Sequence, residues 1–229
     1  MIELPSPFFN KPYEPSDLDY LKEEVAFLRA SPILNPIDYN RYWEYGKVLS
    51  FFKRYGKSDG NVLEAGGANS PLAAAVSSLG HHVTVTDVLA SGGPYVEYLK
   101  SKGYPNLAWV EASALDLPFP AESFDFVMCI SVLEHVPDDL TAISKLKRVL
   151  KPDGYLILSF DFVQTDRPPT SHQLRFYTQD RLERYILWLG KRHVFPIEAP
   201  DYSYAGEHIA CYGDSASVYN GAMLICMKD

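Results

Sequence analysis

Apolar residues in the first quarter of the chain recur every three or four positions, which is the period of an amphipathic helix. One such stripe covers residues 18–28 and is stopped by Ser31-Pro32. A second stripe begins near Asp38 and ends at Gly56. The residues before the first stripe are rich in proline and aromatic side chains. We therefore expect residues 1–56 to form an extended arm and a helical cap.

From residue 61 onward, short runs rich in β-branched residues alternate with helical stripes, which predicts an α/β unit over residues 57–229. Such alternation favours a parallel sheet with helices on both faces. The expected strands are 61–65, 82–87, 107–111, 124–131, 155–162 and 219–227, and the expected helices are 70–79, 95–102, 138–150 and 178–190.

The charge and the cysteine content of the chain limit which partners it can bind and which cellular compartment it suits. The chain of 229 residues has 29 acidic and 21 basic side chains, for a net charge of −8, which disfavours a nucleic-acid partner. Its 3 cysteines cannot all pair, which indicates a reducing compartment. We see no signal peptide and no apolar run near the ~20 residues of a membrane span. We expect a soluble, cytoplasmic protein with no membrane partner, and the sequence leaves the oligomeric state open.

The most informative stretch is the loop after the first strand, where small residues lead into a helix opened by Pro71. Glycines let a ligand lie against the backbone, and the helix start offers free N–H groups. By itself this pattern also fits a tight connection without a ligand. Two carboxylates favour a ligand. Glu64 would attract a cationic group, and Asp87, at the end of the second strand, can accept both hydroxyls of a ribose.

Several blocks in order along residues 60–162 resemble the class I S-adenosylmethionine-dependent methyltransferases that act on small molecules. The blocks are Val62-Leu63-Glu64-Ala65-Gly66, Asp87, Leu117-Pro118-Phe119-Pro120, Ser123-Phe124-Asp125, Leu133-Glu134-His135-Val136 and Leu150-Lys151-Pro152-Asp153-Gly154. The resemblance implies a Rossmann-like, mostly parallel seven-stranded sheet with an antiparallel C-terminal strand. It also implies S-adenosylmethionine as cofactor and a small-molecule acceptor. The chain departs from the family's glycine-rich loop at Ala68 and Ser70.

The resemblance also implies roles for individual residues. Glu64 and Gly66 would lie under the methionine part of the cofactor, Asp87 would hold the ribose, and Ser113 and Ala114 would face the adenine. Ile130 and Ser131 would contact the methionine amine. The full set predicted to bind the cofactor is Glu64, Gly66, Gly67, Asp87, Val88, Ser113, Ala114, Ile130 and Ser131.

Methyl transfer from a sulfonium needs mainly in-line approach, so no obligatory catalytic residue is expected. His135 is the candidate base, against the alternative that it only packs its loop. Glu134 is expected to orient that loop. Candidate contacts to the acceptor are Tyr39, Tyr42, Trp43, His172 and Arg175, although the aromatic residues among them also suit a core.

Two other classes of protein share parts of this pattern. A dehydrogenase would need a Gly-x-Gly-x-x-Gly loop, which residues 66–71 lack. A non-catalytic protein that binds S-adenosylmethionine remains open because of Ala68 and Ser70. His208, Cys211 and Asp214 fall short of a metal-site pattern, and no metal is expected. The predicted function is methyl transfer to an oxygen or nitrogen atom of a small molecule.

Overall fold

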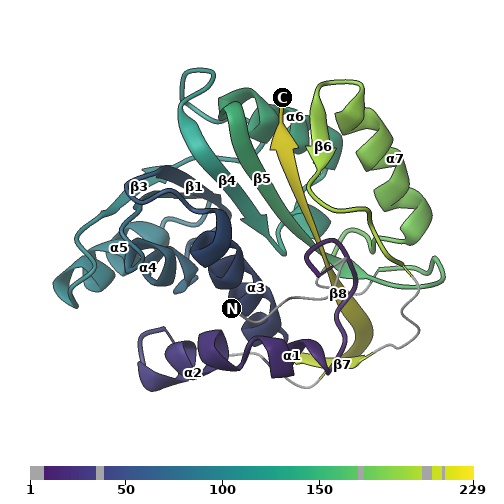
Figure 1. Ribbon diagram of the computed structural model, residues 1–229, viewed down its shortest axis with the longest axis horizontal. Helices are drawn as coiled ribbons and strands as arrows, with labels where there is room; N and C mark the ends of the chain where they lie inside the picture. Colours follow the sequence, from purple (N-terminus) through teal and green to yellow (C-terminus); the bar gives the residue numbers. More distant parts are fainter. Residues whose placement is uncertain (1–7, 35–38, 170–172, 203–207, 213–214) are drawn as a thin grey trace.

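The computed structural model describes residues 8–34, 39–169, 173–202, 208–212 and 215–229. Its strands follow the order β3-β2-β1-β4-β5-β8-β6, and β7 pairs with β8 outside this path (Figure 1). The pairs among β1 to β5 are parallel, whereas β8 is antiparallel to β5 and to β6. The predicted α/β fold, mostly parallel with an antiparallel C-terminal strand, is therefore confirmed. The strands are β1 (Asn61–Ala65), β2 (His82–Asp87), β3 (Leu107–Glu111), β4 (Phe124–Ile130), β5 (Leu150–Phe162), β6 (Val194–Pro196), β7 (His208–Tyr212) and β8 (Ser215–Lys228).

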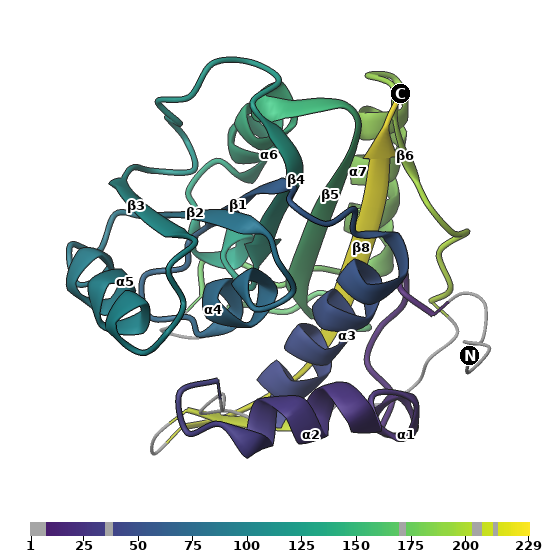
Figure 2. The ribbon, with the colours of Figure 1, turned by 60° about the vertical axis from the view of Figure 1, so that its left-hand side comes forward.

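Helices cover both faces of the sheet, and each face has its own core (Figures 1 and 2). One core joins α3, α4 and α5 to the sheet, and the other joins α6 and α7 to it. Because α3 contributes Val48, Leu49, Phe51 and Phe52 to the first core, the N-terminal helical segment packs directly on the sheet. The helices are α1 (Asp17–Tyr20), α2 (Lys22–Ala30), α3 (Tyr39–Tyr55), α4 (Leu72–Ser77), α5 (Gly92–Ser101), the 3-10 turn η1 (Leu133–His135), α6 (Asp139–Val149) and α7 (Gln179–Gly190).

The first predicted helix is two helices, α1 and α2, that meet at Leu21. Asp17 is fully buried there, and its carboxylate accepts a hydrogen bond from the indole of Trp43 at 2.9 Å and pairs with Lys11 at 2.9 Å. Leu21 packs against Gly46 of α3, where an added Cβ would lie 3.2 Å from Leu21 Cδ1. The contacts that Asp17 and Leu21 make with other elements therefore stabilise a break where the sequence predicted one continuous helix.

The β-structure of the second half is more extensive than predicted. β5 begins at Leu150, not at residue 155, and the β4–β5 register shifts between Phe124 and Phe126. The shift lies beside Pro152, which has no N–H, and Asp153, whose φ is +59°. The short strand β6 and the β7–β8 pairing, where a loop and a shorter strand were expected, also went unpredicted.

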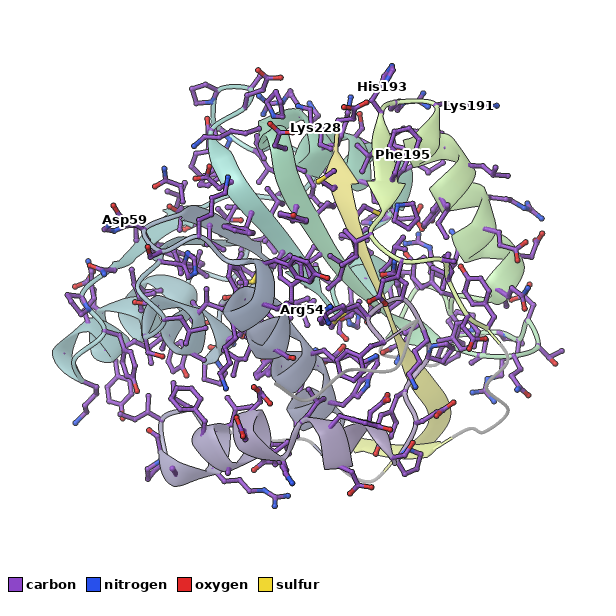
Figure 3. All side chains as sticks on the ribbon, in the orientation of Figure 1. Arg54, Asp59, Lys191, His193, Phe195 and Lys228 are labelled. Atoms are coloured by element: carbon purple, nitrogen blue, oxygen red, sulfur yellow. The ribbon has the colours of Figure 1, made fainter. Side chains whose placement is uncertain are left out.

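The parallel strands place their carboxyl ends at the edge of the sheet that faces α3, as the arrowheads of β4 and β5 show (Figure 1). Lys191, His193 and Lys228 lie at the opposite end of the sheet (Figure 3). The basic groups labelled there are therefore remote from the carboxyl ends. Among the described helices, none has the length and apolar character that a bilayer crossing requires.

Candidate active site

The loop between β1 and α4 lies against β2 through its backbone. The N–H groups of Gly66 and Gly67 both donate to the carbonyl of Thr86, at 2.7 and 3.2 Å. Gly66 has a φ of +87°, and a Cβ at this position would lie 2.3 Å from Cγ2 of Val132. Only glycine fits both the conformation and the space, so this loop can bring its backbone close to a ligand.

Asp87, at the end of β2, anchors the same loop. One carboxylate oxygen accepts the N–H of Ala68 at 3.2 Å, and the other accepts the N–H of Leu89 at 3.0 Å. Each carboxylate oxygen has further lone pairs, so both can still accept from a ligand. The methyl group of Ala68, where the family has glycine, is buried and leaves this bond intact.

Two adjoining cavities open at the carboxyl ends of the strands, with volumes of about 470 and 410 Å³. They share Gly66, Asp87, Leu89 and Ser131, so they form one crevice around the end of β2. The larger cavity is also lined by Arg41, Tyr45, Glu64, Tyr95 and Ile130, and the smaller one by Val88, Ser113, Ala114, Val132 and His135. Most of the residues predicted to bind the cofactor therefore lie around this crevice; Gly67 is buried beneath it against Glu64.

Glu64 is a buried acid in the larger cavity. Its side chain is 3% exposed, and its Oε2 has no hydrogen-bond donor among the described residues. Burial raises the pKa of Glu64 to about 8, and Asp87 adds to this rise, whereas Ser70, the N–H of Ala73 and Arg41 oppose it. An orphaned carboxyl oxygen at this point is a ready partner for a cationic ligand.

Helix α3 contributes residues to the crevice that the sequence did not reveal. Arg41 donates to Oε2 of Glu44 at 2.7 Å, and the hydroxyl of Tyr45 lies 3.0 Å from that of Ser70. The other oxygen of Glu44 accepts from the hydroxyls of Ser131 and Ser159, which ties α3 to the ends of β4 and β5. The sequence signal for them was weak: Arg41 and Glu44 are a polar pair near the start of a helix that is rich in aromatic residues and has other charged residues as well.

The aromatic residues proposed to contact the acceptor occupy other positions. Trp43 is buried, donates to Asp17 and packs against Gly221, so it belongs to the core. Tyr42 is half-buried beneath the guanidinium of Arg29, 4.8 Å from its ring centre. The 100° turn per residue that directs Arg41 and Tyr45 to the cavity points Trp43 away from it. The side chain of Tyr39 and all of His172 lie outside the described residues.

His135 is the last residue of the turn η1, and Arg175 binds the backbone of this turn. His135 is exposed and lines the smaller cavity, beside Ser113 and Ala114. Arg175 donates to the carbonyls of Leu133 (2.8 Å), Val136 and Pro137 (2.8 Å). The guanidinium of Arg175, which we predicted to contact the acceptor, is therefore engaged by the backbone of this turn.

Replacement of Arg175 by methionine should lower the free energy of unfolding by about 2–4 kcal/mol, because several carbonyls lose their donor at once. Lysine should recover less than half, since one ammonium cannot bridge these carbonyls. Urea unfolding measures both. Arg184→Met is the matched control: Arg184 is 72% exposed on α7, and its loss should change stability by less than about 0.5 kcal/mol. Equal effects at the two positions would contradict the structural role of Arg175.

Among the described residues, no group of three or more His, Cys, Asp or Glu side chains could hold a metal ion. The side chains of His208 and Cys211, and all of Asp214, fall outside this description.

Comparisons with known proteins agree on one family. Residues 63–158 match the model of the family described as "Methyltransferase domain". A demethylmenaquinone methyltransferase of Lysinibacillus sphaericus is 33% identical over 78 residues, 34% of this chain and 33% of that relative. A ubiquinone biosynthesis O-methyltransferase of Haemophilus ducreyi is 33% identical over 135 residues, 56% of this chain and 52% of that relative. The matches thus span a third to about half of these curated relatives' length.

The fold is shared over most of the chain with a solved methyltransferase structure. The 1,6-didemethyltoxoflavin-N1-methyltransferase of Burkholderia thailandensis superposes with a TM-score of 0.60 and 16% identity, covering 95% of this chain and 92% of that one. That structure contains 1,6-didemethyltoxoflavin and S-adenosylhomocysteine. Residues 63–158 of this chain therefore match a methyltransferase domain, and the glycine loop and Asp87 lie in a fold shared with a solved methyltransferase structure.

Proposed function

We propose that this protein transfers a methyl group from S-adenosylmethionine to an oxygen or nitrogen atom of a small-molecule acceptor. The observation that carries the proposal is the crevice at the carboxyl ends of the strands, where Gly66, Asp87 and Glu64, with its orphaned Oε2, lie together. A crevice at this edge is where open α/β sheets bind nucleotide-like ligands.

The residues around the crevice fit the parts of the cofactor. The Asp87 carboxylate can accept from both ribose hydroxyls, and Ser113 and Ala114 line the cavity that suits the adenine. At the other end, Glu64 would pair with the ammonium group of the methionine part. Arg41, which lines the same cavity, would pair with its carboxylate.

Catalysis at such a site is mainly positioning. When bound, S-adenosylmethionine supplies an electrophilic methyl group on a sulfonium sulfur. The protein's task is to hold the acceptor atom about 3–3.5 Å from that methyl carbon and in line with the breaking bond. Ser131 and Ile130 line the cavity at the end of β4, so the acceptor would approach across this strand end.

The relatives favour a small acceptor built on a ring. Two act, by their names, in demethylmenaquinone methylation and ubiquinone biosynthesis, and the structural neighbour holds a small heterocycle. We therefore propose a hydroxylated or nitrogen-containing ring as the acceptor.

The experiment has two stages. Calorimetric titration with S-adenosylhomocysteine should give micromolar binding, and NAD should give none. Labelled S-adenosylmethionine is then offered with catechols, hydroxyquinols, N-heterocycles and alkyl amines, and methylated products are sought. Binding without transfer to any of them would favour the non-catalytic protein of the same fold. Absence of binding would reject both functions.

Cofactor binding should depend on pH through Glu64. In the free protein its pKa is about 8, and pairing with the cofactor's ammonium would lower it, so binding releases a proton. Affinity for S-adenosylhomocysteine should rise with pH, by up to about tenfold per unit between roughly pH 6 and 8, and then level off. Glu64→Gln should weaken binding and flatten this dependence. Calorimetry in buffers of different ionisation enthalpy measures the proton directly, and no release from the wild type would contradict the pairing.

A further inference from the structure

Glu134, in the turn η1, is a buried acid whose surroundings differ from those of Glu64. Its side chain is 0% exposed, and neither carboxyl oxygen receives a hydrogen bond from a described donor. A lone ionised carboxylate in such a place would be very costly. The carboxyl group of Asp161 interacts with that of Glu134, so a proton held between the two can stabilise both.

Asp161 lies near the end of β5, beyond the point where this strand pairs with the end of β4. Ile130, which lines the crevice, pairs in register with Ser159, and the hydroxyl of Ser159 accepts the N–H of Ser131 at 2.9 Å. Because side chains two residues apart on a strand share a face, Asp161 follows Ser159 on the same face, past the end of β4. At 6% exposed it is the less buried member of the pair with Glu134.

Charged and polar groups face the Glu134–Asp161 pair from α3 and from the loop before α7. Glu44 and Arg41 face it from α3, and the amide of Gln173 donates to Asp161 Oδ2 at 2.7 Å. Arg41, Ser131 and Ser159 donate to Glu44, and Gln173 donates to Asp161. No described donor reaches Glu134, so the pair has an excess of acceptors. A ligand that brings an O–H or N–H donor would relieve that excess, which is what an acceptor of a methyl group does before transfer.

We propose that Asp161 is the proton acceptor for methyl transfer, and that Glu134 is a positioning residue that holds it by a shared proton. This inference rests on the proposed function. In the step, the acceptor O–H or N–H proton passes to Asp161 while the acceptor lone pair bonds to the methyl carbon. The carbon–sulfur bond breaks and its electron pair stays on sulfur. No other reactant is required, and the proton leaves to solvent after the product.

The protonation states of the pair agree with this geometry. Burial, with the charge of Asp161, raises the pKa of Glu134 well above its usual range, which favours Glu134 as the proton-holding member of the pair. Burial raises the pKa of Asp161 to about 6, with Glu44 adding to the rise, and Gln173, Arg41 and Glu134 opposing it. Above pH 6 Asp161 is therefore ionised and able to accept a proton.

The first test needs no acceptor. An infrared difference spectrum, wild type minus Glu134→Gln at pH 7, should contain the carbonyl band of a protonated carboxylic acid. A difference that shows only ionised carboxylate bands would overturn the shared proton, and with it the proposal. Because Glu64 is unchanged between the two proteins, its own signal cancels.

The second test measures turnover on a ring acceptor identified by the labelling screen. Asp161→Asn should lower kcat by about 10²–10⁴-fold while leaving affinity for S-adenosylhomocysteine within about threefold. Wild-type kcat should fall below pH 6 with a one-proton slope, and this limb should be absent from the residual activity of Asp161→Asn. Glu134→Ala should lower kcat, and Glu134→Gln, which can still donate to Asp161, should recover most of the loss.

Controls separate this proposal from its rivals. Asp180→Asn makes the same chemical change at a side chain that is 72% exposed on α7, and its kcat should equal the wild-type value. If Asp161→Asn keeps wild-type kcat and the acidic limb disappears in His135→Ala instead, His135 is the base and the proposal is wrong. If the wild type methylates no acceptor, the proposed function fails, and the infrared result still decides whether the proton is shared.

Discussion

Gly66→Ala should abolish measurable binding of S-adenosylhomocysteine, which corresponds to a loss of affinity of at least about 100-fold. A Cβ at this position would lie 2.3 Å from Cγ2 and 2.8 Å from Cγ1 of Val132. Either the loop or the start of the turn after β4 must move, and both line the crevice. The backbone at Gly66 also has a φ of +87°, which costs an alanine about 1–2 kcal/mol.

Two further variants separate the overlap from the backbone strain. Gly80 has a φ of +96°, and nothing lies within 4 Å of a Cβ built there. Gly80→Ala should therefore lose about 1 kcal/mol of stability and keep wild-type affinity. The double variant Gly66→Ala with Val132→Ala should regain part of the affinity, because the overlapping methyl groups are removed. If calorimetry finds the single Gly66→Ala variant within threefold of the wild type, the loop does not form the cradle.

The glycine loop could be predicted because its determinants are local. Gly66 and Pro71 mark the loop and the start of α4, and Asp87 follows directly from the end of β2. Parallel strands bring such ends to one edge whatever the rest of the chain does. The predicted bounds of β1, β2 and β3 were also correct, because these bounds too are set locally. Each strand is a short run rich in apolar or β-branched residues between turn residues.

The contribution of α3 could not be predicted, because it depends on how a helix from one end of the chain docks on the sheet. The aromatic residues of this helix drew attention to Trp43, whereas the side chains that reach the crevice are Arg41 and Tyr45. Nothing in the sequence tells which face of an aromatic-rich helix meets the core. The partners of Glu44, Ser131 and Ser159, are 87 and 115 residues away.

The burial of Glu134 and the exposure of His135, which are neighbours in the sequence, could not be predicted either. From the sequence we predicted that His135 is the candidate base, because histidine is the commonest general base, and that Glu134 orients the loop. In the structure the turn η1 directs Glu134 inward, where it is fully buried, and leaves His135 exposed. A one-residue difference in a turn decides which side chain meets β5, and residue preferences carry no information on that.

Asp87→Ala should weaken binding of S-adenosylhomocysteine by about 10²–10⁴-fold, because two charge-assisted hydrogen bonds to the ribose, each about 1.5–3 kcal/mol, are lost together. The fold should survive, since β2 is held by its parallel pairs with β1 and β3. Calorimetry gives the affinity, and thermal unfolding checks the fold. Asp180→Ala removes an exposed carboxylate from α7 and should change neither.

Asp87 also accepts the N–H groups of Ala68 and Leu89, so lost affinity alone does not establish contact with the ribose. A ligand that lacks the ribose 2′-hydroxyl separates the two effects. The wild type should bind the 2′-deoxy analogue of S-adenosylhomocysteine at least tenfold more weakly than the parent, because one oxygen of Asp87 loses its donor. Asp87→Ala should bind both ligands equally. If the variant still discriminates between them, the 2′-hydroxyl is recognised elsewhere, and Asp87 acts on the cofactor only by holding the loop.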